Sequence, residues 1–197
     1  MNYLVIGLGN PGEKYQKTRH NAGWIVLDSA FPDLVWKKNP YANALIAGAH
    51  AEGLSFEMSP TTEAQVTFVK PQTFMNHSGE TVEYFMKKEG IVSESVIVLY
   101  DDIDLPLGSM RISFDRGSGG HNGIKSIESH VSGRNFIRIR IGISRAGENG
   151  AVVKPNVLGN FEDEELEKIT SLGRSVGLAI KTIIMHGKEK AMTEFNQ

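Results

Sequence analysis

The sequence predicts an α/β fold: a single-domain three-layer αβα sandwich with a mixed, largely parallel central sheet, spanning residues 1–197. Two observations lead to this prediction. Short apolar runs typical of buried strands alternate along the chain with segments whose apolar residues recur at helical spacing, as in folds that pack helices on a sheet. The 197 residues are 40% hydrophobic, and they contain no repeat, low-complexity stretch or linker that would divide them.

The first half of the chain predicts two strands and two helices. Each strand is an apolar run closed by glycine or proline, and each helix has an apolar stripe. The second helix is expected to be capped by Ser78 and to bury Val82, Phe85 and Met86. In order, the elements are a strand at 3–8, a helix at 21–31, a strand at 65–70 and a helix that begins near Ser78 and stops at Gly90.

The second half predicts three strands and two helices. Along 136–143 the isoleucines alternate with Arg138 and Arg140, which predicts a strand with one dry face and one basic face. An acidic first turn at 162–165 suits a helix N-terminus. The expected elements are a strand at 95–100 that ends at Asp101, a strand at 110–114, a helix that contains Ile124, Ile127 and Val131, a strand at 136–143 and a helix over 162–185.

Composition excludes several classes of protein. The absence of cysteine rules out disulfides, thiol catalysis and thiolate-bound metals, and it suits a reducing compartment. The first residues have no basic region, and their apolar run is too short for a signal peptide. No stretch approaches the roughly 18 apolar residues of a membrane span. We therefore expect a cytoplasmic protein that has no contact with membranes.

Charge is unevenly distributed along the chain. The net charge is −2, but residues 108–145 hold seven basic and two acidic residues, a balance of +5. A local basic surface on a mildly acidic protein suits a few phosphate contacts better than a long nucleic-acid track.

Two glycine motifs resemble well-known sites without their context. Residues 7–12 fit G-x-G-x-x-G, but Pro11 lacks an N–H and disfavours helical conformation at Asn10, so no helix is expected to begin there. Residues 173–177 fit G-x-S-x-G, yet they lie inside a helical pattern instead of a strand-turn-helix junction. Neither a dinucleotide site nor a serine nucleophile is favoured.

The acidic cluster Asp101-Asp102-Ile103-Asp104 resembles the oxygen ligands of a hard cation. We favour a turn after a buried strand, with Asp102 exposed and Asp104 bonded to nearby backbone, and with Asp101 as the one functional acid. The six histidines show no H-x-x-x-H or similar spacing. We therefore expect neither a metal nor a cofactor.

Three loop asparagines suggest a common site with His20 and Asp101. Asn10, Asn76 and Asn122 each lie on a loop beside a glycine or after a methionine. Taken singly, each of these residues has an ordinary structural explanation. Together they offer a base, an acid that orients it, and neutral amides that can donate and accept hydrogen bonds.

The resemblance to a known family is carried by six blocks that cover essentially the whole chain. They are GLGNPGEKYQKTRHNAGW, FVKPQTFMNHSGETV, VLYDDIDLPLGSMRI, GSGGHNGIKSI, FIRIRIGI and VLGNF. In content and order they resemble the signature blocks of bacterial peptidyl-tRNA hydrolases.

The resemblance implies hydrolysis, without metal or cofactor, of the ester between a peptide and the 3′-terminal ribose of tRNA. It implies a cytoplasmic monomer that binds the acceptor end of peptidyl-tRNA, with residues 157–161 in a mobile segment beside the cleft. Carried over by position, the catalytic residues are His20 and Asp101, and the substrate-binding residues are Asn10, Tyr15, Met75, Asn76, His121 and Asn122.

The expected chemistry needs no nucleophile from the protein. Asp101 would accept the Nδ1–H of His20, while the His20 Nε2 takes a proton from the water that attacks the ester. One or more asparagine amides would stabilise the oxyanion.

The tRNA phosphates would meet Arg140, which matches a basic position of the family. Where relatives usually carry a second basic residue this chain has Ser113, and we expect Arg116 to supply that charge from nearby.

Three other classes of function remain as alternatives. One is an RNA-binding protein without catalysis on the same scaffold, against which the joint presence of His20, Asp101 and the three asparagines argues. The others are a nucleotide-dependent oxidoreductase that uses residues 7–12 and a metal-dependent esterase.

Overall fold

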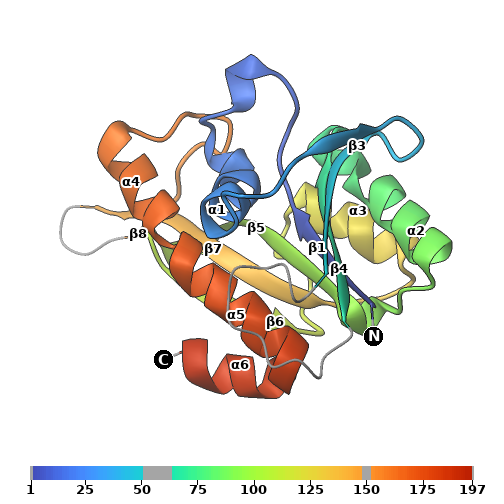
Figure 1. Cartoon of the computed structure of the whole chain (residues 1–197). Helices are drawn as coiled ribbons and strands as arrows, with labels where there is room; N and C mark the ends of the chain where they lie inside the picture. Colours follow the sequence, from blue (N-terminus) through green and yellow to red (C-terminus); the bar gives the residue numbers. More distant parts are fainter. Residues whose placement is uncertain (1, 51–63, 148–151, 197) are drawn as a thin grey trace.

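The computed structural model describes residues 2–50, 64–147 and 152–196, which form a central sheet between two layers of helices (Figure 1). The short strand β8 (Val152–Val153) pairs with β7 beside the main path of the sheet. Along that path the strands are β2 (Lys37–Asn39), β3 (Ala44–His50), β4 (Gln65–Pro71), β1 (Asn2–Gly7), β5 (Val96–Pro106), β7 (Ile137–Ala146) and β6 (Met110–Phe114).

The sheet is parallel at its centre and antiparallel at both edges. Strands β4, β1, β5 and β7 pair in parallel, whereas β2, β3 and β6 join by antiparallel pairing. The first six residues of β5 are all buried, as expected for a strand covered on both faces. The prediction of a mixed sheet between helical layers is confirmed, with the parallel pairing confined to the four central strands.

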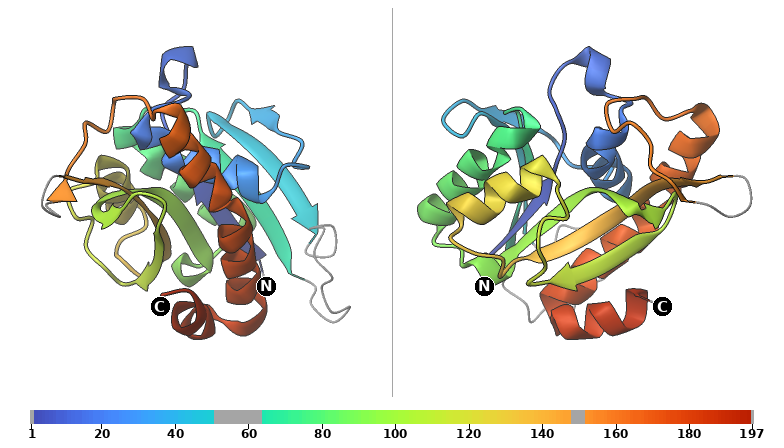
Figure 2. Two further views of the ribbon diagram at one scale, coloured as in Figure 1. Left: turned by 90° about the vertical axis from the view of Figure 1, so that its left-hand side faces the viewer. Right: turned by 180° about the vertical axis from the view of Figure 1, so that it is seen from behind.

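Alternation along the strands divides the core into two clusters. In β1, Leu4 and Ile6 pack toward α2 (Ser78–Glu89) and α3 (Asn122–His130), whereas Val5 packs toward α1 (Ala22–Ala30) and α5 (Gly173–His186). Helix α4 (Asp163–Ser171) joins the second layer, and α6 (Lys188–Phe195) lies against β6 and α5 (Figure 2). No helix in the described part of the chain has the length and apolar character needed to cross a bilayer.

The connection between β1 and α1 contains two 3-10 turns, η1 (Glu13–Tyr15) and η2 (Arg19–Asn21), and further 3-10 turns are η4 (Met75–His77) and η5 (Ser93–Ser95). Helix α1 begins only at Ala22, well after the glycine motif at 7–12. The φ of Gly12 is +106°, a conformation that suits glycine. The geometry of a dinucleotide-binding turn is therefore not formed there, as the presence of Pro11 indicated.

The predicted turn after Asp101 is wrong, because β5 continues to Pro106. Pairing with β7 places Asp101 opposite Ile141 and Asp102 opposite Gly142, so ladder hydrogen bonds override the turn character of the acidic cluster. Asp102 is not exposed: its side chain is 11% accessible and pairs with Arg140. The side chain of Asp104 pairs with Lys154, while its backbone N–H donates to Asp102.

The predicted basic face of β7 is also wrong. The side chains of Arg138 and Arg140 are 0% and 5% exposed, and Glu128 and Asp102 pair with them at 3.0 and 2.6 Å. Helix α3 supplies Glu128, so the polar side of this strand is covered by a helix and neutralised by carboxylates. Alternation in the sequence indicates which residues share a face, but it does not show what covers that face.

Smaller differences concern helix ends. The helix expected over 162–185 is two helices, α4 and α5, that meet at Leu172. Ser78 is the first residue of α2, not its cap, and its hydroxyl donates to the Met75 carbonyl. Gly90 ends α2 in the left-handed conformation, as predicted. The β2–β3 hairpin and α6 were not predicted.

Candidate active site

Asp101 occupies a position set by the sheet itself. Strand β1 pairs with β5 only as far as Gly7 opposite Leu99, so Asp101 follows just beyond the carboxyl end of β1. It is 2% exposed and is held on its other side by pairing with Ile141 of β7. Open α/β sheets bind their ligands at this edge.

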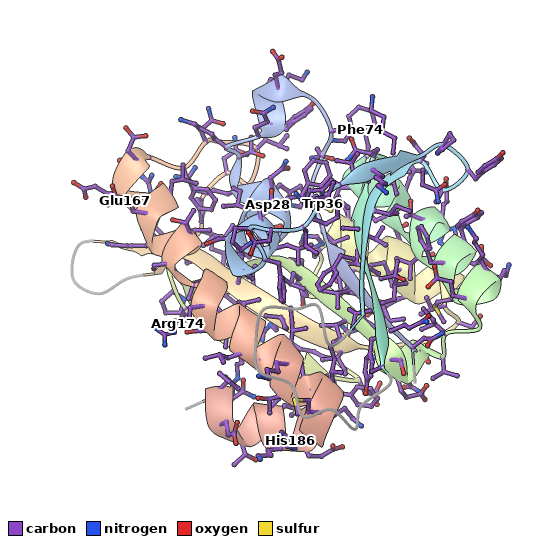
Figure 3. All side chains as sticks on the ribbon, in the orientation of Figure 1. Asp28, Trp36, Phe74, Glu167, Arg174 and His186 are labelled. Atoms are coloured by element: carbon purple, nitrogen blue, oxygen red, sulfur yellow. The ribbon has the colours of Figure 1, made fainter. Side chains whose placement is uncertain are left out.

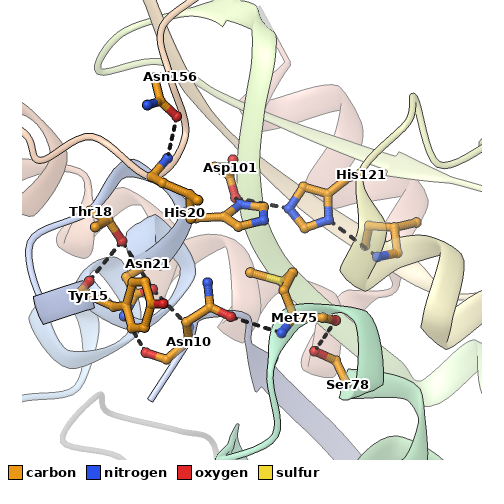
Figure 4. A network of polar contacts seen from close by, with 12 residues as sticks. Asn10, Tyr15, Thr18, His20, Asn21, Met75, Ser78, Asp101, His121 and Asn156 are labelled. Atoms are coloured by element: carbon orange, nitrogen blue, oxygen red, sulfur yellow. Dashed lines mark hydrogen bonds and ion pairs between the residues drawn. The ribbon is translucent and has the colours of Figure 1, made fainter. Parts of the chain in front are cut away.

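Two imidazoles share one oxygen of this carboxylate (Figure 4). The Nδ1 of His20, from η2, lies 2.8 Å from the Asp101 Oδ1, and the Nε2 of His121 lies 2.9 Å from the same atom. The centroids of the two rings are 4.8 Å apart. His20 and Asp101 are 81 positions apart in the sequence, and Asp101 and His121 are 20 positions apart. The fold therefore brings together three residues that are distant along the chain.

The two imidazoles are not equivalent. His121 caps α3, and its Nδ1 accepts from the N–H of Ile124 at 3.3 Å, so its Nε2 carries the proton that is donated to Asp101. Both nitrogens of His121 are then engaged. His20 donates from Nδ1, and no described residue bonds to its Nε2. Of the two rings, only that of His20 keeps a free nitrogen lone pair.

Asp101 is held in its charged form by this arrangement. Burial alone would raise its pKa, but the charge and hydrogen bond of His121 and those of His20 outweigh burial and lower the pKa well below its usual range. The carboxylate is therefore anionic at neutral pH.

Asn10 lies near the His20 ring (Figure 4), and hydrogen bonds with Asn21 and Met75 fix its orientation. The backbone N–H of Asn10 donates to the Asn21 Oδ1 at 2.8 Å, and the Asn21 Nδ2 donates to the Asn10 carbonyl at 3.1 Å. The side-chain oxygen of Asn10 accepts from the N–H of Met75 at 2.9 Å. The amide nitrogen of Asn10 is thereby turned to the side of the His20 ring (Figure 4), and no described residue accepts from it.

A cavity of about 250 Å³ opens beside the two histidines. Burial and the charge of Asp102 raise the pKa of Tyr100 to about 12, so this residue presents a neutral hydroxyl. The cavity is lined by His20, Tyr100, Asp101, Asp102, Ile103, Asp104, residues 116–120, His121, Asn122, Arg140 and Val157.

The remaining residues expected in the site lie around this centre. Asn122 is exposed and lines the cavity as the first residue of α3. Asn76 is exposed, and its side chain makes no hydrogen bond with a described residue. Tyr15 stands 6.5 Å from Phe74, edge to face, and Phe74 lies at the surface (Figure 3). Met75 is 4% exposed and packs in the hydrophobic core, and its backbone N–H donates to Asn10.

The two arginines expected at phosphates differ in environment. Arg140 borders the cavity, but its Nε donates to Asp102 at 2.6 Å. Arg116 is exposed, borders the same cavity and makes no ion pair with a described residue. Arg116 is thus the more available cation.

Three residues important to this geometry were missed by the sequence reasoning. Asn21 holds the backbone of Asn10, Asp102 neutralises Arg140, and Arg19 binds across the chain to Glu165. Arg19 and Asn21 are the sequence neighbours of His20. This adjacency is the only feature of the sequence that could have indicated a role for them. The partner of Arg19 is 146 residues away and left no signal in the sequence.

His20, Asp101 and His121 are also the kinds of ligand that hold transition metals, and their ligand atoms lie within 4.8 Å of one another. The spacing of the histidines in the sequence did not indicate this cluster. However, the two nitrogen atoms already donate to Asp101, so a metal ion would have to displace protons from both rings.

Comparison with known proteins gives one consistent result. Residues 4–197 match the model of the family described as peptidyl-tRNA hydrolase. The peptidyl-tRNA hydrolase of Fervidobacterium nodosum is 42% identical over 193 residues, which cover 98% of this chain and 95% of that protein. That of Bdellovibrio bacteriovorus is 38% identical over 194 residues, with coverage of 98% and 99%.

Solved structures agree. The crystal structure of peptidyl-tRNA hydrolase from Acinetobacter baumannii superposes with a TM-score of 0.81 at 32% identity, covering 98% of this chain and 94% of that one. The match of sequence and fold over nearly the whole length shows that this chain belongs to the peptidyl-tRNA hydrolase family.

Proposed function

We propose that this protein hydrolyses the ester between the C-terminal carbonyl of a peptide, or of an N-blocked amino acid, and the 3′-terminal ribose of tRNA. The observation that carries the proposal is the inequivalence of the two imidazoles. His20 donates its Nδ1–H to a buried carboxylate and keeps Nε2 free, which is the arrangement of a general base.

In the first step, His20 Nε2 takes a proton from a water molecule as the water oxygen bonds to the ester carbonyl carbon. Asp101 stabilises the imidazolium that forms, because its carboxylate is already anionic. In the second step, the bond to the ribose oxygen breaks and that oxygen takes the proton from Nε2. Free tRNA and a peptide carboxylic acid leave, and the base is restored.

Asn10 is the favoured donor to the oxyanion among the three asparagines. Because its oxygen is engaged by the Met75 N–H, its amide nitrogen is the group left to donate. A preorganised donor of this kind contributes about 2.7–4 kcal/mol to transition-state stabilisation. Asn76 and Asn122 are exposed and suit the peptide backbone, since an amide can both accept from N–H and donate to C=O.

Tyr15, Met75 and His121 complete the proposed peptide side of the site. Tyr15 stands edge to face with Phe74 and adds apolar surface near the catalytic turn, while Met75 holds Asn10 through its N–H. His121 orients Asp101.

For the tRNA, Arg116 is proposed as a direct phosphate contact, in place of the basic residue that Ser113 replaces. Arg140 would contact phosphate only in competition with Asp102.

We further propose that the enzyme acts in the cytoplasm as a monomer, with no cofactor or metal. Both rings that could bind a metal serve as donors to Asp101, which favours a metal-free reaction. A chelator should leave turnover unchanged, and loss of turnover that zinc restores would contradict this part of the proposal.

The decisive experiment incubates the purified protein with N-acetyl-aminoacyl-tRNA and follows release of free tRNA. The unmodified protein should turn over, and His20→Ala should lower kcat by about 10²–10⁴-fold while tRNA binding is retained. His130→Ala, in α3 and without contact to Asp101, serves as the matched histidine control. Near-normal turnover by His20→Ala would refute the mechanism.

A further inference from the structure

The segment that carries His20 is bound along its backbone to residues 157–161. The N–H of His20 donates to the Val157 carbonyl at 2.8 Å, and the N–H of Arg19 donates to the Gly159 carbonyl at 3.0 Å. In the reverse direction, the N–H of Phe161 donates to the Lys17 carbonyl at 2.9 Å. The position of His20 therefore depends on where residues 157–161 lie.

The side chain of Arg19 reinforces this attachment. Its two terminal nitrogens donate to the Asn160 carbonyl and to the Glu165 carboxylate, both at 2.6 Å. The side chains of Arg19 and Glu165 are only 6% and 10% exposed, and the guanidinium lies 5.4 Å from the ring centroid of Phe161. Arg19 thus connects the base-carrying turn to both the 157–161 segment and α4.

Glu165 is the centre of a larger network. Besides Arg19, it accepts from the N–H of Glu162 in the capping box of α4 and from Arg145 at the end of β7. Burial would raise its pKa, but the hydrogen bonds from Arg145 and Glu162 and the charge of Arg19 lower the pKa to about 2. Strand β7 also pairs with Asp101 through Ile141. The network therefore starts on the strand beside the catalytic acid and ends on the turn that carries the base.

We propose that Arg19 and Glu165 act as a positioning pair for hydrolysis, holding the His20 imidazole in register with Asp101. The proposal rests on the role proposed for His20 as the base. A buried ion pair offers little net stability, because the loss of hydration offsets the attraction between the charges. A positioning role explains its placement, since a general base loses rate steeply when its geometry is displaced.

The test compares two isosteric substitutions. Glu165→Gln removes the charge that Arg19 binds. Glu128→Gln does the same to Arg138, which is also buried in an Arg–Glu pair but makes no hydrogen bond or ion pair with the catalytic turn or Asp101. Expected results are a fall in kcat of roughly tenfold or more for Glu165→Gln with KM nearly unchanged, and a kcat within about twofold of the unmodified protein for Glu128→Gln.

A spectroscopic measurement separates positioning from general stability. In protein labelled with ¹⁵N at histidine, the downfield proton on His20 Nδ1 reports its hydrogen bond to Asp101. This signal should broaden or move upfield in Glu165→Gln and stay in place in Glu128→Gln. Arg19→Lys retains the charge but can satisfy only one of the two acceptors, so it should give an intermediate kcat.

A double variant tests whether Arg19 and Glu165 act together. Removing both partners, in Arg19→Gln with Glu165→Gln, should cost no more kcat than either change alone. If Glu165→Gln does not fold, Arg19→Lys and its His20 signal carry the test. An unchanged kcat and an unchanged His20 signal in the folded variants would overturn the proposal. Turnover by His20→Ala would instead refute the proposed function, so the two failures are distinguishable.

Discussion

The acid and the base that we propose for this site are positioned in different ways. Asp101 lies within a central strand, where ladder pairing with β7 and two helical layers determine its place. His20 lies on a 3-10 turn in a long connection, where contacts with residues more than 130 positions away determine its place. A site can thus combine a rigid carboxylate from the sheet with an imidazole whose geometry depends on tertiary contacts.

This difference has a consequence for substitutions. Changes around Asp101 should act through stability or through its charge, because the strand cannot shift without disturbing the core. Changes around His20 should act on the rate more than on stability, because its turn lies at the edge of the core and bonds to another loop. Four predictions test this distinction.

The largest effect is expected from Asp101→Asn. An amide keeps the shape but loses the charge that stabilises the imidazolium, so kcat should fall by about 10²–10⁴-fold in the tRNA-release assay. The melting temperature, followed by circular dichroism, should also fall, because the charges and hydrogen bonds of His121 and His20 favour the ionised carboxylate over a neutral group in the folded protein. A kcat within a few-fold of the unmodified enzyme would show that the carboxylate is not needed.

Asn10→Asp is expected to have the next largest effect. The carboxylate can still accept from the Met75 N–H, but the donor to the oxyanion becomes an acceptor. The loss of about 2.7–4 kcal/mol corresponds to roughly 10²–10³-fold in kcat. Asn135→Asp, at an exposed loop position, is the control and should retain its rate. If KM rises and kcat is preserved, Asn10 binds substrate without serving the oxyanion.

Alanine substitutions at two glycines, one beside Asp101 on β7 and one beside the turn of His20, test the two regions separately. A methyl group at Gly142 of β7 would lie 2.0 Å from the Pro106 carbonyl oxygen, so Gly142→Ala should cost roughly 1–3 kcal/mol, or about 2–12 °C in Tm. At Gly159 the nearest atoms would be the Arg19 guanidinium at 3.1 Å and the Asn156 carbonyl oxygen at 3.2 Å, which need to give way by only a few tenths of an ångström. Gly159→Ala should therefore change Tm little but lower kcat a few-fold. The reverse pattern, in calorimetry and turnover, would contradict the distinction.

The smallest effect concerns acid stability. Since the pKa of Glu165 is lowered from 4.5 to about 2 in the folded protein, its ionised form stabilises the fold above pH 4.5. That contribution is lost as pH falls from 4.5 toward 2. Glu165→Gln should show a shallower decline of Tm over this window, with Asp101 still contributing to the remaining slope. Parallel curves for the two proteins would show that Glu165 is not linked to stability.

Much of the fold was predictable from local patterns. The runs at 3–8 and 65–70 and the isoleucine alternation of 136–143 identified β1, β4 and β7, since each signal lies within the strand itself. The β2–β3 hairpin and α6 gave weaker signals, and the acidic residues after Asp101 suggested a turn where pairing with β7 extends the strand. These errors occur where contacts between distant elements decide the conformation.

The sequence by itself determined the family and the order of the main elements, and it singled out His20, Asp101 and the three asparagines as candidate site residues, because those features lie in short contiguous blocks. Only the tertiary structure decided that His121 donates to the same oxygen of Asp101 as His20, that Asn10 presents its amide nitrogen, and that Arg140 is already paired. It also revealed the link from Arg19 to Glu165. The physical reason is that hydrogen bonds and ion pairs depend on distances in space, and chain positions far apart carry no local record of them.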